Sequence, residues 1–109
     1  MLSLTAIKNS WDTDKKTIIS FLNSILENDT YKIILLLMKK SKTVYQIHDE
    51  TNLPLSSIYK RIKKLENMGI VSIDRIHINS RGRKTIFYKS RLRSINFRLN
   101  ENDIDLVVN

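Results

Sequence analysis

The sequence contains no cysteine, only two glycines and one proline, and no long hydrophobic run. Without cysteine there are no disulfides, thiolate metal ligands or cysteine nucleophiles, and the composition fits a cytoplasmic protein. The longest apolar run, Ile33 to Met38, is far shorter than the ~20 residues that cross a bilayer. No basic segment followed by an apolar core opens the chain, so we expect neither a secretory signal nor a membrane partner.

Motifs for catalysis and metal binding are equally scarce. No P-loop and no Gly-x-Gly-x-x-Gly occurs, and two glycines are too few for a loop that cradles phosphates. His48 and His77 lie far apart in the sequence, whereas a zinc site needs three or four ligands. The carboxylates in 12–14 and 49–50 fit helix caps and surface charge better than acid–base catalysis. We therefore expect no enzyme, no metal site and no cofactor.

The charge is strongly polarised along the chain. The formal net charge is +8, and between Lys60 and Arg98 twelve basic residues face only two acidic ones, Glu66 and Asp74. Because phosphate contacts supply most of the non-specific affinity for nucleic acid, this pattern favours a polyanionic partner. A basic face that only keeps the protein soluble is the alternative. The secondary-structure elements that carry the charge decide between these two interpretations.

Apolar spacing predicts helices in the first half of the chain. Apolar residues three and four positions apart indicate an amphipathic helix over about 14–27. Tyr31 to Lys40 is apolar on all sides, which predicts a buried second helix. Thr43 and Gln46 have the spacing of a capping box and would start a short third helix over about 44–51.

A turn at 52–55 separates this third helix from a fourth. Asparagine tolerates the left-handed conformation at a helix end, and proline suits the start of the next helix. The fourth helix runs to about Met68, where Gly69 is placed to stop it, and it has one apolar face, formed by Ile58, Ile62 and Leu65. Two helices joined by so short a turn make a helix-turn-helix.

After the fourth helix the apolar period changes from 3.6 to 2. Alternation over 70–78 and again over 85–88 predicts two strands, with 79–83 as the tip of a hairpin. A further alternating set over 95–99 and 104–108 predicts a second hairpin, or an extended tail that pairs with another strand.

This order of elements resembles the winged helix-turn-helix DNA-binding regulators, particularly the ArsR-like group, and the segments 43–47 and 52–71 carry most of the resemblance. It covers about residues 14–90 and implies an α+β, mostly helical fold, with three to four helices, a β-hairpin wing and a C-terminal β extension. It also implies a homodimer on near-palindromic DNA. His48 stands where related sequences have a small residue, and the cysteines of metal-sensing members are missing, so a sensor role is not carried over.

The expected organisation has three parts: an N-terminal arm over 1–12, the DNA-binding domain over 13–90, and a β extension over 91–109 that serves dimerisation. Within the arm, Trp11 fits a core or interface anchor. Asp12 or Thr13 would cap the first helix.

Seven candidate DNA-binding residues lie in the fourth helix: Ser56, Ser57, Tyr59, Lys60, Arg61, Lys63 and Lys64. The two serines allow close approach of the helix N-terminus to DNA. Lys60 can reach guanine acceptors, and Tyr59 can reach a phosphate or a thymine methyl. The other three cations are expected to contact phosphates and fix the register. The alternative is the ordinary solvated face of an amphipathic helix.

Three more candidates, Arg81, Arg83 and Lys84, surround Gly82 at the tip of the first hairpin. The glycine allows a tight turn from which three cations project. Such a tip is expected along the DNA backbone or in the minor groove, where arginine is favoured. The alternative is a solubilising hairpin end.

These features predict a sequence-specific transcription regulator of double-stranded DNA, with the helix over about 55–68 in the major groove and the wing over about 79–84 beside it. The main alternative is a winged-helix protein-interaction module in a larger assembly, without direct DNA readout. RNA binding ranks lower because exposed aromatic residues for base stacking are scarce, Tyr59 being the obvious one.

Overall fold

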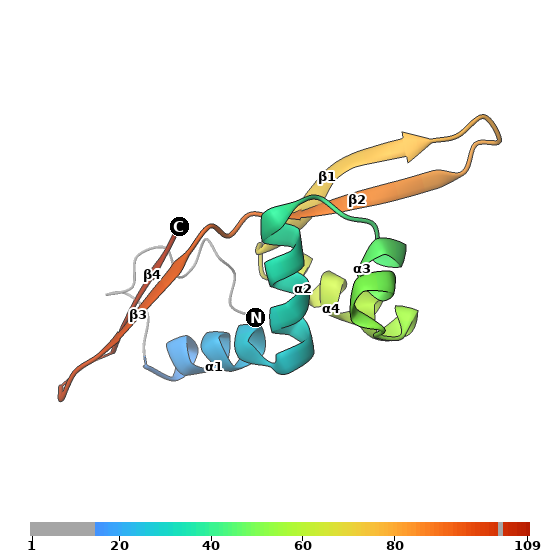
Figure 1. Ribbon diagram of the computed structural model, residues 1–109. Coiled ribbons are helices and arrows are strands. Elements are labelled where there is room, and N and C mark those ends of the chain that lie inside the picture. Colours follow the sequence, from blue (N-terminus) through green and yellow to red (C-terminus); the bar gives the residue numbers. More distant parts are fainter. Residues whose placement is uncertain (1–14, 103) are drawn as a thin grey trace.

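The computed structural model describes residues 15–102 and 104–109. Four helices precede four strands: α1 (Lys15–Leu26), α2 (Asn28–Lys39), α3 (Val44–Thr51), α4 (Leu55–Asn67), β1 (Val71–Ile78), β2 (Lys84–Ser90), β3 (Ile95–Leu99) and β4 (Ile104–Val108). The predicted α+β winged helix-turn-helix with a C-terminal β extension is confirmed (Figure 1). The predicted arm over 1–12, with Trp11 and the proposed caps, lies outside the described residues. No described helix has the length and apolar character needed to cross a membrane.

The junction of α1 and α2 is shorter than expected. The segment 28–30, which lies between the two predicted helices, forms the first turn of α2. The reason is a cap: the Glu27 carboxylate accepts a hydrogen bond from the Thr30 N–H at 2.9 Å and satisfies one of the free donors at the start of the helix. The two helices therefore follow one another almost without a linker.

Helix α2 is buried on one side only, so the prediction of a wholly buried helix was wrong. Its inner face holds Ile33, Ile34 and Leu37 in the core. Three large apolar residues one or two turns apart remain on the outer face, 38–44% exposed: Tyr31, Leu35 and Met38. The helix packs against α1, α3 and β2, and these neighbours leave its outer side uncovered.

Helix α3 begins and ends as its sequence predicts. Thr43 and Gln46 form the capping box, with reciprocal hydrogen bonds of 3.1 and 2.9 Å. Asn52 closes the helix in the left-handed conformation (φ 62°). His48 Nδ1 lies 2.6 Å from the carbonyl oxygen of Leu53, and since a carbonyl only accepts, this nitrogen carries the proton. The hydrogen bond from His48 thus stabilises the turn that leads into α4.

Helix α4 packs on the core through its predicted apolar face, because Ile58, Ile62 and Leu65 are all buried. The helix ends at Asn67, and Gly69 follows its C-cap with a φ of 77°. The Ile70 N–H donates to the Leu65 carbonyl at 2.9 Å and closes the end of the helix.

The wing is the antiparallel pair of β1 and β2, in register from Val71 opposite Ser90 to Ile78 opposite Lys84. The loop between α2 and α3 is hydrogen-bonded to its base. Backbone groups of Lys42 and Tyr88 exchange two hydrogen bonds of 3.0 and 2.8 Å. The Ser41 hydroxyl donates to Asp74 at 2.7 Å, beside the bulge in β1. These contacts set the direction in which the wing leaves the domain.

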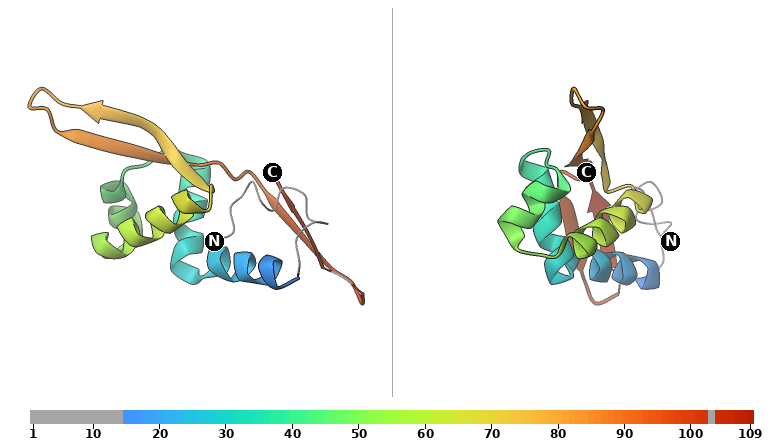
Figure 2. Two further views of the ribbon diagram at one scale, coloured as in Figure 1. Left: turned by 180° about the vertical axis from the view of Figure 1, so that it is seen from behind. Right: turned by 90° about the vertical axis from the view of Figure 1, so that its right-hand side faces the viewer.

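The C-terminal segment forms a hairpin within the chain. Strands β3 and β4 pair antiparallel, with Ile95 opposite Val108 and Leu99 opposite Ile104. Leu106 is fully buried and belongs to the same hydrophobic cluster as Phe21 of α1. The molecule is elongated, 58 × 24 × 23 Å, and this hairpin and the wing lie at opposite ends of it (Figures 1 and 2).

Candidate nucleic-acid interface

Helix α4 exposes a polar ridge on the side away from the core. With a turn every 3.6 residues, burial of Ile58 and Ile62 directs Ser56, Lys60 and Lys63 outward, and all three are exposed. No side chain caps the helix at Pro54, so its first N–H groups are not satisfied by a capping side chain. The start of α4 therefore combines small side chains, N–H groups that its N-cap residue Pro54 does not cap, and nearby cations.

One flank of α4 faces the wing. Burial raises the pKa of Tyr88 in β2, and the neighbouring Glu66 and Tyr59 raise it further. The pKa of Tyr59 is itself raised by burial and by the adjacent Tyr45 of α3. Tyr59 is 49% exposed and Tyr45 is 60% exposed. The sequence pattern did not single out Tyr45, and more aromatic side chains are exposed than that pattern indicated.

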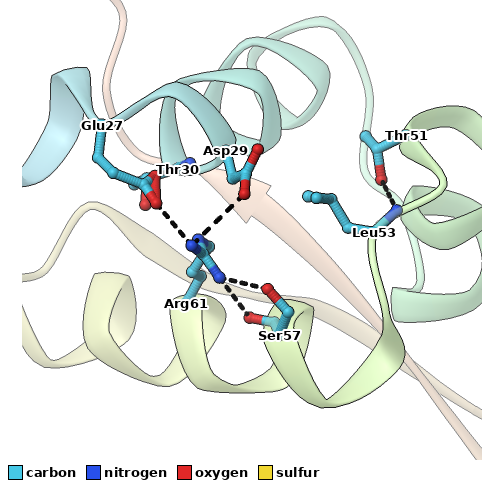
Figure 3. A network of polar contacts seen from close by, with 7 residues as sticks. All are labelled: Glu27, Asp29, Thr30, Thr51, Leu53, Ser57 and Arg61. Carbon is cyan, nitrogen blue, oxygen red and sulfur yellow. Dashed lines mark hydrogen bonds and ion pairs between the residues drawn. The ribbon is translucent and has the colours of Figure 1, made fainter.

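The opposite flank faces the α1–α2 junction and holds a network of polar contacts (Figure 3). Arg61 Nη2 lies 2.5 Å from Glu27 Oε1 and 3.6 Å from Asp29 Oδ2. Arg61 Nη1 contacts the hydroxyl of Ser57 and lies 3.4 Å from the Ser57 carbonyl oxygen. Two predicted DNA-binding residues, Arg61 and Ser57, thus have partners within the protein. The Arg61 guanidinium and the Thr30 N–H hold the pKa of Glu27 at about 2, below its usual 4.5.

The wing tip presents its predicted cations to solvent. Asn79 Oδ1 accepts hydrogen bonds from the N–H groups of Arg81 and Arg83, both at 2.9 Å. Gly82 has a φ of 78°, with open space where a Cβ would lie. Glycine is therefore needed there for backbone conformation, not for room. Arg81, Arg83 and Lys84 are exposed, and none has a carboxylate partner among the described residues.

The wing and the α3–α4 turn project from the same end of the molecule, on the right-hand side of Figure 1. The right-hand view in Figure 2 looks onto this end, with the wing above the helix-turn-helix. The two predicted DNA-binding segments are thus exposed at one end.

A comparison with protein families adds a second line of evidence. Residues 14–90 match the family described as "Sugar-specific transcriptional regulator TrmB". The chain belongs to the TrmB family. It is thus a DNA-binding transcription regulator of the winged helix-turn-helix type, from a family that is not a family of enzymes. The predicted winged helix-turn-helix class is confirmed, whereas the ArsR-like subgroup is not. The chain matches no curated protein.

Most of the positive charge of this TrmB-family domain is free for a partner. Four of the twelve cations between residues 60 and 98 pair with carboxylates, namely Arg61, Arg75, Lys89 and Arg98. Arg75 also stacks on the ring of Phe87, 4.0 Å from its centroid. The others have no carboxylate partner in the described part of the chain: Lys60, Lys63, Lys64, Arg81, Arg83, Lys84, Arg91 and Arg93.

A groove of about 710 Å³ lies between α1 and α4 of this TrmB-family protein. Lys16, Ser20 and Asn23 line one wall from α1, and Lys60 and Lys64 line the other from α4. Sequence analysis did not connect the residues of α1 with the site, because no local pattern shows that α1 folds back beside α4. The described residues contain no group of three side chains suited to bind a metal ion.

Proposed function

We propose that this TrmB-family protein is a sequence-specific regulator of double-stranded DNA, with α4 in the major groove and the wing, about 79–84, on the backbone or in the minor groove. The observation that supports this most is the shared exposure of two cationic segments at one end of the molecule: the outer ridge of α4 and the wing tip. An α-helix of this kind fits the major groove of B-DNA.

Within this proposal the residues of α4 take different parts. Ser56 allows the uncapped start of α4 to approach a phosphate. Lys60 donates to guanine acceptors, and Tyr59 contacts a phosphate or a thymine methyl. Lys63 and Lys64 contact phosphates and fix the register. On the wing, the contacts come from Arg81, Arg83 and Lys84.

Arg61 and Ser57 have a different role in this proposal from the one that the sequence suggested. Their mutual contact and the ion pair of Arg61 with Glu27 face the α1–α2 junction. We therefore assign them to positioning α4 instead of contacting DNA directly.

We further propose a homodimer, acting in the cytoplasm. The apolar surface at the end opposite the wing supports the dimer, since Phe97, Leu99 and Val107 of the C-terminal hairpin are exposed. A two-fold dimer places two copies of α4 on half-sites about 10 bp apart or a multiple of it.

Selection of bound duplexes from a random pool tests the proposal. The expected result is one enriched motif with two half-sites at a fixed spacing. An interaction module without DNA readout would instead enrich no motif and pass through a duplex-DNA column at moderate salt. The exposed stripe on the outer face of α2, formed by Tyr31, Leu35 and Met38, is the feature that favours this alternative.

A further inference from the structure

The α1–α4 groove carries cations and hydrogen-bonding side chains on a lining that also includes the apolar Ile19. Its cations Lys16, Lys60 and Lys64 have no carboxylate partner among the described residues. The one carboxylate in its lining, Glu27, is already held by Arg61. Counting the described residues alone, the groove therefore carries an excess of positive charge, which attracts an anion.

Neutral hydrogen-bond donors accompany these cations. The side chains of Ser20 and Asn23 are exposed in the α1 wall and have no hydrogen-bond partner in the described part of the chain. The Ser24 hydroxyl, by contrast, donates to the Ser20 carbonyl at 3.0 Å. Lysine, serine and asparagine side chains are among the groups that hold DNA phosphates and sugars.

The position of the groove relative to α4 suggests which anion it takes. Tyr59 and Glu66 lie on the flank beside Tyr88 of the wing. Arg61 and Lys64 lie on the other flank, beside α1. A helix about 10–12 Å in diameter fills a major groove about 12 Å wide, so its two flanks approach the two backbone strands. The wing is placed for one strand, and the α1–α4 groove for the other.

We propose that the α1–α4 groove seats the second backbone strand of the DNA, on the side of α4 opposite the wing. Lys16 and Lys64 contact its phosphates, and Asn23 and Ser20 donate hydrogen bonds to phosphate or sugar oxygens. This inference rests on the proposed function, which assigned no DNA contact to α1. The protein then contacts the DNA backbone on both flanks of α4.

The floor of the groove keeps its walls in place. Glu27 directly follows α1, caps α2 through Thr30 and binds Arg61 in the middle of α4. This single carboxylate thereby links the two walls before DNA arrives. A preformed site loses less entropy on binding than one that must order itself.

The absence of cysteine allows a direct test with single-cysteine variants that carry an iron chelate, which cleaves the nearest DNA backbone. Ser20→Cys places the chelate in the groove and Ser80→Cys places it at the wing tip. Glu101→Cys, in the turn of the C-terminal hairpin, is the control. With a selected duplex, we expect the Ser20 and Ser80 variants to cleave backbone on opposite sides of the bases that α4 covers.

The outcomes separate this inference from the proposed function. Cleavage by the Ser80 variant alone, or equal cleavage by the Ser20 and Glu101 variants, overturns the groove proposal and leaves the proposed function standing. Absence of cleavage by both the Ser20 and the Ser80 variant, with no retention of the unlabelled protein on duplex DNA, contradicts both.

A charge substitution provides the second measurement. Lys16→Gln should weaken binding to all duplexes alike and reduce the slope of log K against log salt by about 0.9, the value for one phosphate contact. Lys32→Gln on α2 makes the same charge change outside the groove and should leave the slope unchanged. Equal slopes for Lys16→Gln and the unmodified protein would count against the groove.

Discussion

Arg61 Nη2 and Glu27 Oε1 lie 2.5 Å apart although the two residues are 34 positions apart in the sequence. This contact ties the middle of α4 to the α1–α2 junction, where Glu27 also caps α2. The orientation of α4 on the domain therefore depends on a residue that belongs to neither element of the helix-turn-helix.

Replacing Glu27 should weaken DNA binding, although Glu27 itself has no contact with DNA in the proposed complex. Glu27→Gln removes the nearer of the two carboxylate partners of Arg61, and we expect a loss of about 0.5–1 kcal/mol in the free energy of unfolding, as for other exposed ion pairs. DNA affinity should fall, because α4 is held less firmly. Urea denaturation and fluorescence anisotropy measure the two effects.

The matched control is Asp105→Asn, which removes one carboxylate charge from the ion pair with Arg98 in the C-terminal hairpin, at the end of the molecule opposite the wing. If Arg61 is a phosphate contact restrained by Glu27, Glu27→Gln will instead raise DNA affinity above that of the control.

Acid should weaken the fold partly through Glu27. Its pKa is held at about 2 in the folded protein, against 4.5 for the free side chain. A carboxylate with a depressed pKa stabilises the folded state above its unfolded-state pKa, and this contribution is lost as the pH falls from about 4.5 towards 2. The free energy of unfolding should therefore fall less steeply across this window in Glu27→Gln. Parallel curves for the two proteins would be inconsistent with the ion pair.

Lys60 and Arg83 should affect DNA binding in different ways. Lys60→Gln removes a proposed base contact. The free energy by which the protein discriminates between bases at one position of the DNA site should therefore fall by about 1–3 kcal/mol. Arg83→Gln removes a proposed phosphate contact, so all duplexes should bind more weakly and the salt slope should drop by about 0.9. Titrations of the selected duplex and a scrambled one over a range of salt distinguish the two. The same loss of affinity for every DNA sequence in both variants would contradict the assignment of Lys60 to a base and Arg83 to a phosphate.

Asn52 should tolerate glycine better than alanine. It closes α3 in the left-handed conformation, φ 62°, which costs a residue with a Cβ about 1–2 kcal/mol unless its side chain offers compensation. Asn52→Ala should lower the free energy of unfolding by about 1 kcal/mol, and Asn52→Gly should remain close to the unmodified protein. Equal losses would indicate that the asparagine side chain, not its backbone conformation, stabilises the turn.

The C-terminal hairpin should prove to be part of the hydrophobic core. Leu106 is fully buried in the cluster that includes Phe21 of α1, so Leu106→Ala should cost about 2–5 kcal/mol in urea denaturation. Its neighbour Val107 is 44% exposed, and Val107→Ala should cost well under 1 kcal/mol. Similar small losses for both would show that the hairpin is not packed as described.

Local sequence signals predicted most of the elements. The capping box of Thr43 and Gln46, the spacing of Ile58 and Ile62, and the stop at Gly69 act over a few residues, so the sequence shows them directly. The early start of α2 was missed because its cap is a glutamate, a residue outside the usual set of Ser, Thr, Asp and Asn.

The contacts of the site were less accessible to sequence analysis. Whether Arg61 faces DNA or Glu27 depends on how α4 lies against the α1–α2 junction, and no periodicity records a pairing between distant elements. The outer residues of α2 were misjudged for another reason. Large apolar residues such as Leu35 also contribute to protein surfaces, so an apolar helix need not be buried on all sides.

The two hydrogen bonds between Lys42 and Tyr88 hold the base of the wing at one point, so any change of tilt there moves the whole wing. From Ile73, which pairs with Tyr88, to its end at Ile78, β1 extends about 17 Å at ~3.3 Å per residue. A tilt of about 7° at the base then carries this end of the wing through about 2 Å, as much as separates a hydrogen bond from no contact. Small substitutions in the α2–α3 loop, far from any nucleotide, should therefore retune how the tip meets the double helix.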